Sequence, residues 1–300
     1  MHKYTKVNYH IANALIKNNN TLLNKSDIES IFNGKPYEGF MFQNYSNVYF
    51  FLQECRELDL YKQNIEQFES DEKKPMAYAL MRRAMIRKMP YSRLTLNWYK
   101  IVQLRDKEYS YKKYKRRRAY HNQSFKHHFL QNLDEYNLAV FNNNKENIAY
   151  NDNVFNLLDK VKPDIINLDI PYKGTMNNYF GFYGLLDDFI TSEVAKPFDN
   201  NFVSCSIAMQ LFDKLFSKLN NFKYWYLNYN NSSYPSKNEL LYLLGKYSDN
   251  VEVTERKHNY QITGKDKKAK NKEFMFIIKN KAHGLNRCYR KRQADCETAN

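Results

Sequence analysis

The feature that most constrains the fold of this chain is a short apolar run at residues 165–168, which has a proline on either side. The length of the run and its flanking residues, Pro163 and Pro171, are typical of a short buried strand. A carboxylate, Asp169, and an aromatic ring, Tyr172, follow the run. Because ligands of open α/β sheets bind beyond the carboxyl ends of the strands, the pattern predicts a functional site here.

Strand and helix patterns alternate from residue 148 to residue 280. In chain order they predict a strand at 148–150, a helix at 154–158, a strand at 164–169, a loop at 173–184, a helix at 206–219, a strand at 223–229 and a helix that begins after Ser236 and ends near Gly245. Two more strands, at 250–260 and 273–279, are separated by a lysine-rich linker and are expected to pair antiparallel. This alternation predicts an α/β sheet domain.

The first half of the chain carries helical patterns instead. Apolar spacing and capping residues predict helices at 8–17, 26–32, 47–68, 75–88 and 125–142, with a loop at 35–46. In the helix that ends before Pro90, one face is predicted to enter a core through Met76, Leu80, Ala84 and Met85.

Positive charge is concentrated in residues 71–130, which contain 17 Lys and Arg against 4 Asp and Glu, a net charge of +13. Such segregation indicates a surface that binds a polyanion. A basic helical bundle whose charges only face solvent is the plain alternative. Within residues 109–120 tyrosines alternate with Lys and Arg, so charge for phosphates lies beside rings for bases, and this favours nucleic acid.

We therefore expect this segment to bind double-stranded DNA. The candidate contacts are basic side chains, one ring and two short polar groups that could reach base edges. They are Arg82, Arg83, Arg87, Lys112, Lys113, Lys115, Arg116, Arg117, Arg118, Tyr120, Asn122 and Ser124.

The cysteines and the hydropathy argue against several other classes of protein. Cys55, Cys205, Cys288 and Cys296 lack metal-ligand spacing, so we expect neither a metal site nor a disulfide framework. The first residues lack the apolar region of a signal peptide, and no run approaches the ~18 apolar residues of a membrane span. We expect a cytoplasmic protein that does not enter a membrane.

The sequence Asp169-Ile-Pro-Tyr172 resembles the Asp-Pro-Pro-Tyr motif of the D12 class of adenine-N6 DNA methyltransferases, with Ile170 in place of the first proline. Trp225-Tyr-Leu-Asn-Tyr-Asn230 resembles a later strand of that family, and the basic segment precedes the motif, as in that class. The resemblance extends over roughly residues 5–280, but only the four-residue motif is specific. It implies a Rossmann-like class I methyltransferase sheet with a helical target-recognition insertion.

The resemblance also implies roles for the motif residues. Asp169 and the main-chain carbonyl of Ile170 would each accept one hydrogen of adenine N6, which favours attack of that nitrogen on a methyl group. Tyr172, after Pro171, would stack on the adenine once the base has left the duplex. The methyl donor would be S-adenosylmethionine, and no metal would be needed.

On the cofactor side the sequence resembles the family less closely. Asn151, Asn153 and Phe155 match a motif that usually has an Asp at the position of Asn153. The glycine-rich turn that cradles the methyl donor in the family is expected before the recognition segment, but the first glycine here is Gly34, outside any such turn. We therefore expect an N-terminally incomplete sheet.

Three interpretations stay open at this point. The chain is a site-specific adenine-N6 DNA methyltransferase, or only the C-terminal portion of one, which a second chain could complete. Or it is a catalytically inactive, sequence-specific DNA-binding protein derived from such an enzyme. Alternatively, residues 169–172 are only a turn, because Asp-x-Pro turns are common; the order of the surrounding elements favours the enzyme. The predicted domains are residues 1–70 and 148–280 for the catalytic α/β domain, 71–147 for target recognition and 281–300 for a disordered tail.

Overall fold

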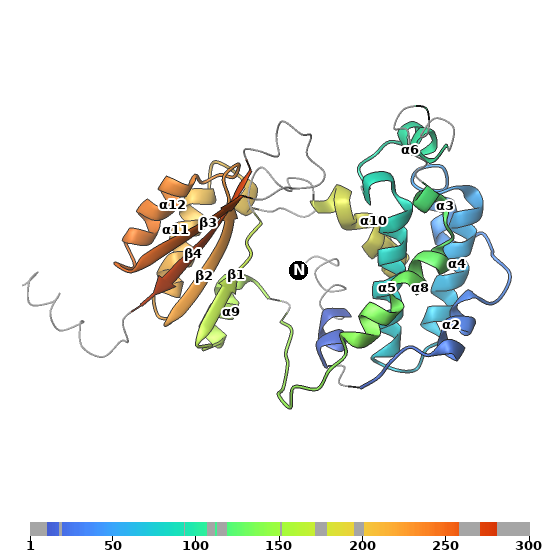
Figure 1. Ribbon diagram of the computed structural model, residues 1–300, viewed down its shortest axis with the longest axis horizontal. Coiled ribbons are helices and arrows are strands. Elements are labelled where there is room, and N and C mark those ends of the chain that lie inside the picture. The colour runs from blue at the N-terminus through green and yellow to red at the C-terminus, as the bar shows by residue number, and fades with distance from the viewer. Residues whose placement is uncertain are drawn as a thin grey trace, which may run out of the picture. The chain divides into compact units, whose positions relative to one another are not determined.

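The computed structural model describes residues 11–17, 20–92, 94–106, 112, 119–150, 152–171, 179–194, 201–257 and 271–280. The chain divides into two compact units. One consists of residues 1–151 and 178–198, and the other of residues 152–177 and 199–300. We call them the helical unit and the sheet unit, and each is described on its own (Figure 1).

The helical unit is built around α5, which contacts α4, α8 and α10. Met76, Leu80, Ala84 and Met85 of α5 are all buried, as their spacing predicts. The helix ends at Lys88, just before Pro90, because a residue that precedes proline is disfavoured in the helical region. The elements of this unit are a helical segment at 11–17, α2 (Lys25–Phe32), α3 (Phe40–Tyr45), α4 (Leu52–Glu66), α5 (Lys73–Lys88), η1 (Pro90–Ser92), α6 (Trp98–Arg105), η2 (Ala119–Asn122), α8 (Phe125–Leu138) and α10 (Tyr179–Thr191).

The sheet unit contains four strands in the order β1-β2-β4-β3. Strand β1 is parallel to β2, whereas β4 is antiparallel to both β2 and β3. The mixed α/β fold and the antiparallel pairing of the last two strands are thus confirmed. The elements are α9 (Val154–Lys160), β1 (Ile165–Leu168), η3 (Asn201–Val203), α11 (Ala208–Leu219), β2 (Tyr224–Asn230), α12 (Lys237–Gly245), β3 (Val251–Lys257) and β4 (Lys272–Lys279).

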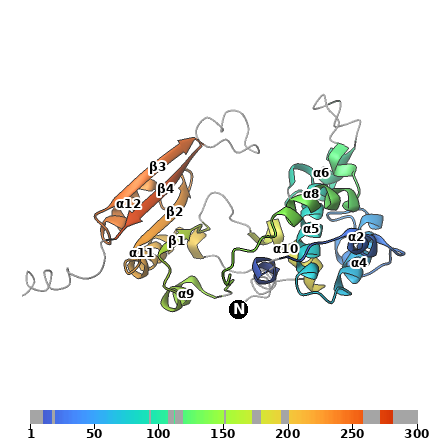
Figure 2. The same ribbon diagram turned by 60° about the horizontal axis from the view of Figure 1, so that its bottom comes forward.

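The two faces of the sheet differ in polarity because side chains alternate along each strand. One face is apolar and packs against α11 and α12, which lie side by side along it (Figures 1 and 2). Trp225, Leu227 and Phe276 on this face are fully buried. On the other face Asn167 and Thr254 are exposed and Tyr226 is half-buried. The buried face stabilises the unit, and the polar side chains lie on the opposite face.

Several local predictions are wrong. Residues 148–150 form no strand, residues 40–45 within the predicted loop form α3, and residues 179–184 begin α10 instead of continuing a loop. The helix predicted at 26–32 begins one residue earlier, at Lys25, because Asn24 is its N-cap and forms a capping box with Asp27. These elements depend on tertiary packing more than on the local sequence pattern.

The units also divide the chain differently from the predicted domains. The described part of residues 1–70 belongs to the helical unit, where Leu58 and Ile65 of α4 share one core with α5. Helix α10 joins the same core, and its Phe189 ring lies 6.0 Å from that of Tyr78. Residues 281–300, predicted to be disordered, lie outside the described residues. In the part of the chain that the structure describes, no helix is long and apolar enough to cross a membrane.

Candidate active site

The predicted site lies directly after β1, at the carboxyl end of that strand. Asp169 is exposed, Ile170 is only 8% exposed, and Pro171 is half-buried. The Ile170 side chain belongs to the hydrophobic core of the sheet unit. This residue therefore fills the core with its side chain, and its main-chain carbonyl is the polar group left to take part in chemistry.

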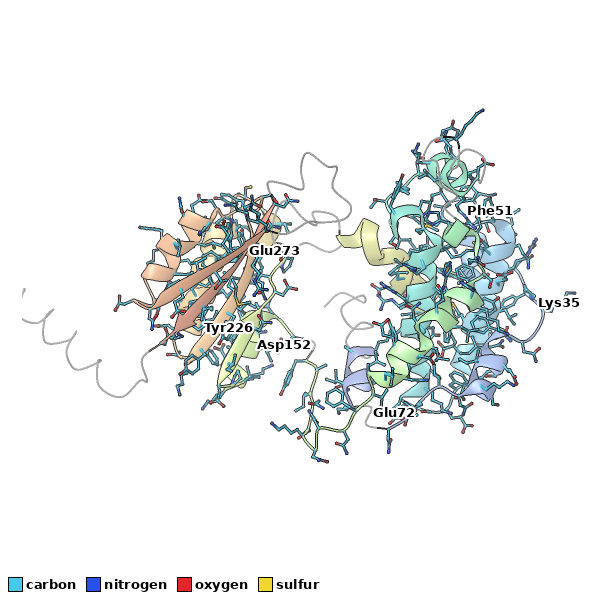
Figure 3. All side chains as sticks on the ribbon, in the orientation of Figure 1. Lys35, Phe51, Glu72, Asp152, Tyr226 and Glu273 are labelled. Carbon is cyan, nitrogen blue, oxygen red and sulfur yellow. The ribbon has the colours of Figure 1, made fainter. Side chains whose placement is uncertain are left out.

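A cavity of about 460 Å³ opens beside Asp169. Its size is within the ~300–1,000 Å³ that is usual for small-molecule sites. Strands β2, β3 and β4 supply the rest of its wall, and Figure 3 shows one of these residues, Glu273, on the sheet. The lining residues are Asp169, Asn228, Tyr229, Thr254, Arg256, Glu273, Phe274 and Met275.

The strand register explains why these residues meet. Met275 of β4 lies opposite Asn228 of β2 on one side and Thr254 of β3 on the other. The pairing of β1 with β2 ends at Leu168 opposite Leu227, so Asp169 follows at the level of Asn228. The sequence predicted Asp169 but missed its partners, because they come from strands that are distant along the chain.

Two asparagines near the end of β2 form side-chain hydrogen bonds close to the strand ends. Asn228 Nδ2 donates a hydrogen bond of 2.9 Å to Asn167 Oδ1, which ties β2 to β1 one residue away from the strand end. Asn230 Oδ1 accepts hydrogen bonds from the backbone N–H and the hydroxyl of Ser232 and from the hydroxyl of Ser233. The resemblance of residues 225–230 to a family strand was the sequence signal that could have identified them.

The cofactor candidates lie on α9. Asn153 is its N-cap, and Asn153 Oδ1 accepts a 2.9 Å hydrogen bond from the backbone N–H of Phe155. The Phe155 ring stacks on Phe202 at 6.2 Å. Phe202 contacts Phe212, which contacts Tyr229 in the cavity wall. Asn151 lies outside the described residues, as does Tyr172.

The described residues do not form the glycine cradle that S-adenosylmethionine would require. A Cβ atom at Gly34, where φ is +118°, would lie 3.1 Å from Leu60, and one at Gly39 would lie 2.8 Å from Asp59. Both glycines are therefore needed for close packing on α4. Asn153 and Phe155 are also engaged in local structure, so the described residues fit the target base better than the methyl donor.

Three of the predicted DNA contacts have partners inside the helical unit. Arg82 forms an ion pair of 3.7 Å with the buried Asp187. Asn122 Nδ2 donates to the Arg105 carbonyl at 2.8 Å, and Ser124 caps α8. These side chains hold the fold together, which a sequence pattern does not reveal.

The remaining DNA candidates differ in what can be said of them. Arg83 and Lys112 are exposed, and Arg87 is half-buried. The backbone of Tyr120 belongs to η2, but its side chain is not described. Lys113, Lys115, Arg116, Arg117 and Arg118 lie outside the described residues.

A buried ionic cluster joins α4, α5 and α6 of the helical unit. The Glu54 carboxylate accepts two hydrogen bonds, of 2.8 and 2.5 Å, from the Arg105 guanidinium and contacts Lys88 Nζ at 2.5 Å. Burial acts to raise the pKa of Glu54, but the hydrogen bonds and charges of Arg105 and Lys88 outweigh it and hold that pKa below its ordinary value. Lys88 also donates to the Gln123 carbonyl at 2.9 Å. The cluster thus links α4 to α5, to α6 and, through Lys88, to the backbone just before α8.

Known proteins resemble this chain over most of its length. The model of the family of D12 class N6 adenine-specific DNA methyltransferases matches residues 4–241. Type II methyltransferase M2.HphI of Haemophilus parahaemolyticus is 54% identical over 275 residues, which are 92% of this chain and 82% of that protein. Modification methylase StsI of Streptococcus sanguinis is 27% identical over 176 residues, which are 54% of this chain and 26% of that protein. No solved structure was found to match the chain.

Proposed function

This chain belongs to the D12 class of N6 adenine-specific DNA methyltransferases, and from this premise we propose that the cavity beside Asp169 receives the flipped target adenine. The observation that carries the proposal is the position of Asp169, exposed at the carboxyl end of β1 and in the wall of a cavity lined by three further strands. A flipped base needs such a pocket, because its reacting atom is not accessible within the duplex.

The residues at the end of β1 suit the chemistry of an exocyclic amine. The lone pair of adenine N6 is conjugated with the ring, so this nitrogen is a poor nucleophile. In our proposal the Asp169 carboxylate and the Ile170 carbonyl each accept one N6 hydrogen, which places the lone pair on nitrogen and stabilises the positive charge that develops there. S-adenosylmethionine supplies the electrophilic methyl group. Tyr172 would stack on the base.

We assign DNA recognition to the helical unit, with the region 71–147 as its centre. Support comes from the net charge of +13 in residues 71–130 and from the exposure of Arg83 and Lys112. Arg82, Asn122 and Ser124 are assigned to the fold, because each has a partner within the protein. We infer that the four strands belong to a Rossmann-like sheet, for which the parallel pair β1–β2 is the support.

The described residues contain no glycine cradle at a strand end, so we propose that a second chain completes the donor site. The same observation supports the second candidate function, a DNA-binding protein without catalytic activity.

One set of measurements separates the two functions. The full chain, alone and with each protein encoded beside it, is incubated with radiolabelled S-adenosylmethionine and DNA of mixed sequence. The enzyme predicts label on adenine N6 in at least one combination. The inactive protein predicts DNA binding that weakens with salt but no heat of S-adenosylmethionine binding in calorimetry. Absence of labelling in every combination contradicts the catalytic proposal.

A further inference from the structure

Asn230, the last residue of β2, has a buried amide nitrogen without a hydrogen-bond partner among the described residues. The residue is only 2% exposed. Its Oδ1 accepts three hydrogen bonds from Ser232 and Ser233. One of these donors is the backbone N–H of Ser232, which can only donate, and this fixes which end of the amide is oxygen. Among the described residues, the hydrogens of the Nδ2 group therefore have no acceptor.

A buried donor without a partner is destabilising, so proteins rarely keep one without a reason. The position of Asn230 indicates that reason. It lies at a strand end, where ligands of α/β sheets bind. Its preceding neighbours, Asn228 and Tyr229, and its ladder partner on β4, Glu273, all line the cavity. On the other side the β1–β2 pairing ends at Leu168 opposite Leu227, so it stops directly before Asp169 and three residues before Asn230.

The proposed adenine site also needs a donor, and Asn230 Nδ2 is a buried one without a partner among the described residues. Asp169 and the Ile170 carbonyl are acceptors and would be used by the two N6 hydrogens. Adenine also presents two ring acceptors, one on either side of N6: N1, which is bonded to C6, and N7, which is bonded to the neighbouring C5. Guanine instead carries a hydrogen on N1, so a donor aimed at N1 would also select against that base.

We propose that Asn230 Nδ2 donates a hydrogen bond to the ring nitrogen of the target adenine, N1 or N7, that flanks the C6–N6 bond. This inference rests on the proposed function, because it needs adenine in the cavity beside Asp169. It makes Asn230 a residue that touches the substrate and sets the in-plane orientation of the base. Ser232 and Ser233 act through it, because they hold the amide in one orientation.

The substitution Asn230→Asp tests the donor separately from the fold. Aspartate has the same shape and still accepts from Ser232 and Ser233, but it offers no hydrogen to the base. We expect kcat/KM for DNA methylation to fall about tenfold or more. Losing a hydrogen bond to the substrate while a buried polar group stays without a partner has an effect of this size. Ser233→Ala is the matched control: it removes one hydrogen bond to Asn230 Oδ1, leaves Nδ2 in place and should lower kcat/KM only a few-fold.

Modified substrates give a readout that a purely structural role would not move. The methylated position is first mapped by sequencing DNA that the full chain has methylated, together with a second chain if one is needed. Duplexes are then made with adenine, 7-deazaadenine or 1-deazaadenine at that position. In the wild type, one of the two analogues should lower kcat/KM about tenfold, and in Asn230→Asp the same analogue should cause no further loss.

Two results would overturn the inference, and they are distinguishable. If the effects of Asn230→Asp and of each analogue multiply, Asn230 does not contact N1 or N7, while the proposed function stands. If the wild type methylates no unmodified duplex in any combination, the proposed function fails and the inference fails with it.

Discussion

Two sets of polar groups, one in each unit, are used in opposite ways. In the helical unit two carboxylates of α4 have partners inside the fold: Glu54 is bound by Lys88 and Arg105, and the Asp59 carboxylate accepts backbone N–H groups from Gly39, Met41 and Phe42. Such groups are used within the fold and hold its helices together. These groups do not need a ligand to complete their hydrogen bonds.

In the sheet unit the polar groups at the strand ends remain available. Asp169 is exposed beside a cavity, and Asn230 keeps a buried amide donor without a partner among the described residues. The difference indicates which polar residues serve the fold and which serve a ligand. Charge alone does not identify a functional residue. The useful criterion is whether the side chain already has an ion-pair or hydrogen-bond partner within the protein.

The largest expected effect is on stability and concerns Glu54. Glu54→Gln removes the charge that compensates Lys88 and Arg105, and breaking a buried ion pair in this way costs about 3–5 kcal/mol. Urea unfolding followed by far-ultraviolet circular dichroism measures the loss.

The control for Glu54 is Glu38→Gln. Its ion pair with Arg56 is exposed, with side chains 55% and 33% accessible, so the loss should be at most about 1 kcal/mol. Equal losses for the two variants would show that burial does not distinguish the cluster from a surface pair.

The second effect is on catalysis and concerns Asp169. Asp169→Ala should lower kcat about 10²–10³-fold, because it removes an acceptor aimed at developing charge. The exposed side chain contributes little to folding, so the urea midpoint should stay unchanged. Asp164→Ala, exposed just before the same strand, is the control and should retain activity. An active Asp169→Ala enzyme would return residues 169–172 to the interpretation of a simple turn.

The third effect is a dependence of stability on pH. The pKa of Glu54 is lowered in the folded protein from its ordinary 4.5, so the folded state favours the charged form. This contribution is fully present above pH 4.5 and is lost as the pH falls through the lower folded pKa. Thermal unfolding between about pH 6 and pH 3 should therefore show a steeper loss of Tm in the wild type than in Glu54→Gln. Parallel curves would mean that Glu54 is not held in its charged form.

The smallest effect separates two neighbouring arginines on α5. Arg83 is exposed, so Arg83→Gln should lower the slope of log Kd against log salt for DNA by about 0.9. Arg82 is paired with Asp187, so Arg82→Gln should leave that slope unchanged and lower the stability of the helical unit instead. Fluorescence anisotropy at several salt concentrations measures both. An equal change of slope in both variants would mean that the ion pair does not keep Arg82 from DNA.

Local features of the sequence predicted much of the fold. Proline on either side of residues 165–168 predicted β1, Ser236 and Glu239 predicted the start of α12, and apolar spacing predicted the buried face of α5. These signals act between residues that are close in the chain, where backbone geometry and capping bonds decide the outcome. The motif that follows β1 was also found from the sequence, because its four residues are consecutive in the chain.

The sequence by itself determined where β1 ends, that Asp169 follows it, and that the chain resembles adenine-N6 DNA methyltransferases. Only the tertiary structure decided which residues surround Asp169, that α10 packs with α5, and that Arg82 and Asn122 have partners inside the protein. The physical reason is that pairing between distant strands and helices depends on the whole core, whereas caps, turns and periodic patterns depend on a few neighbouring residues.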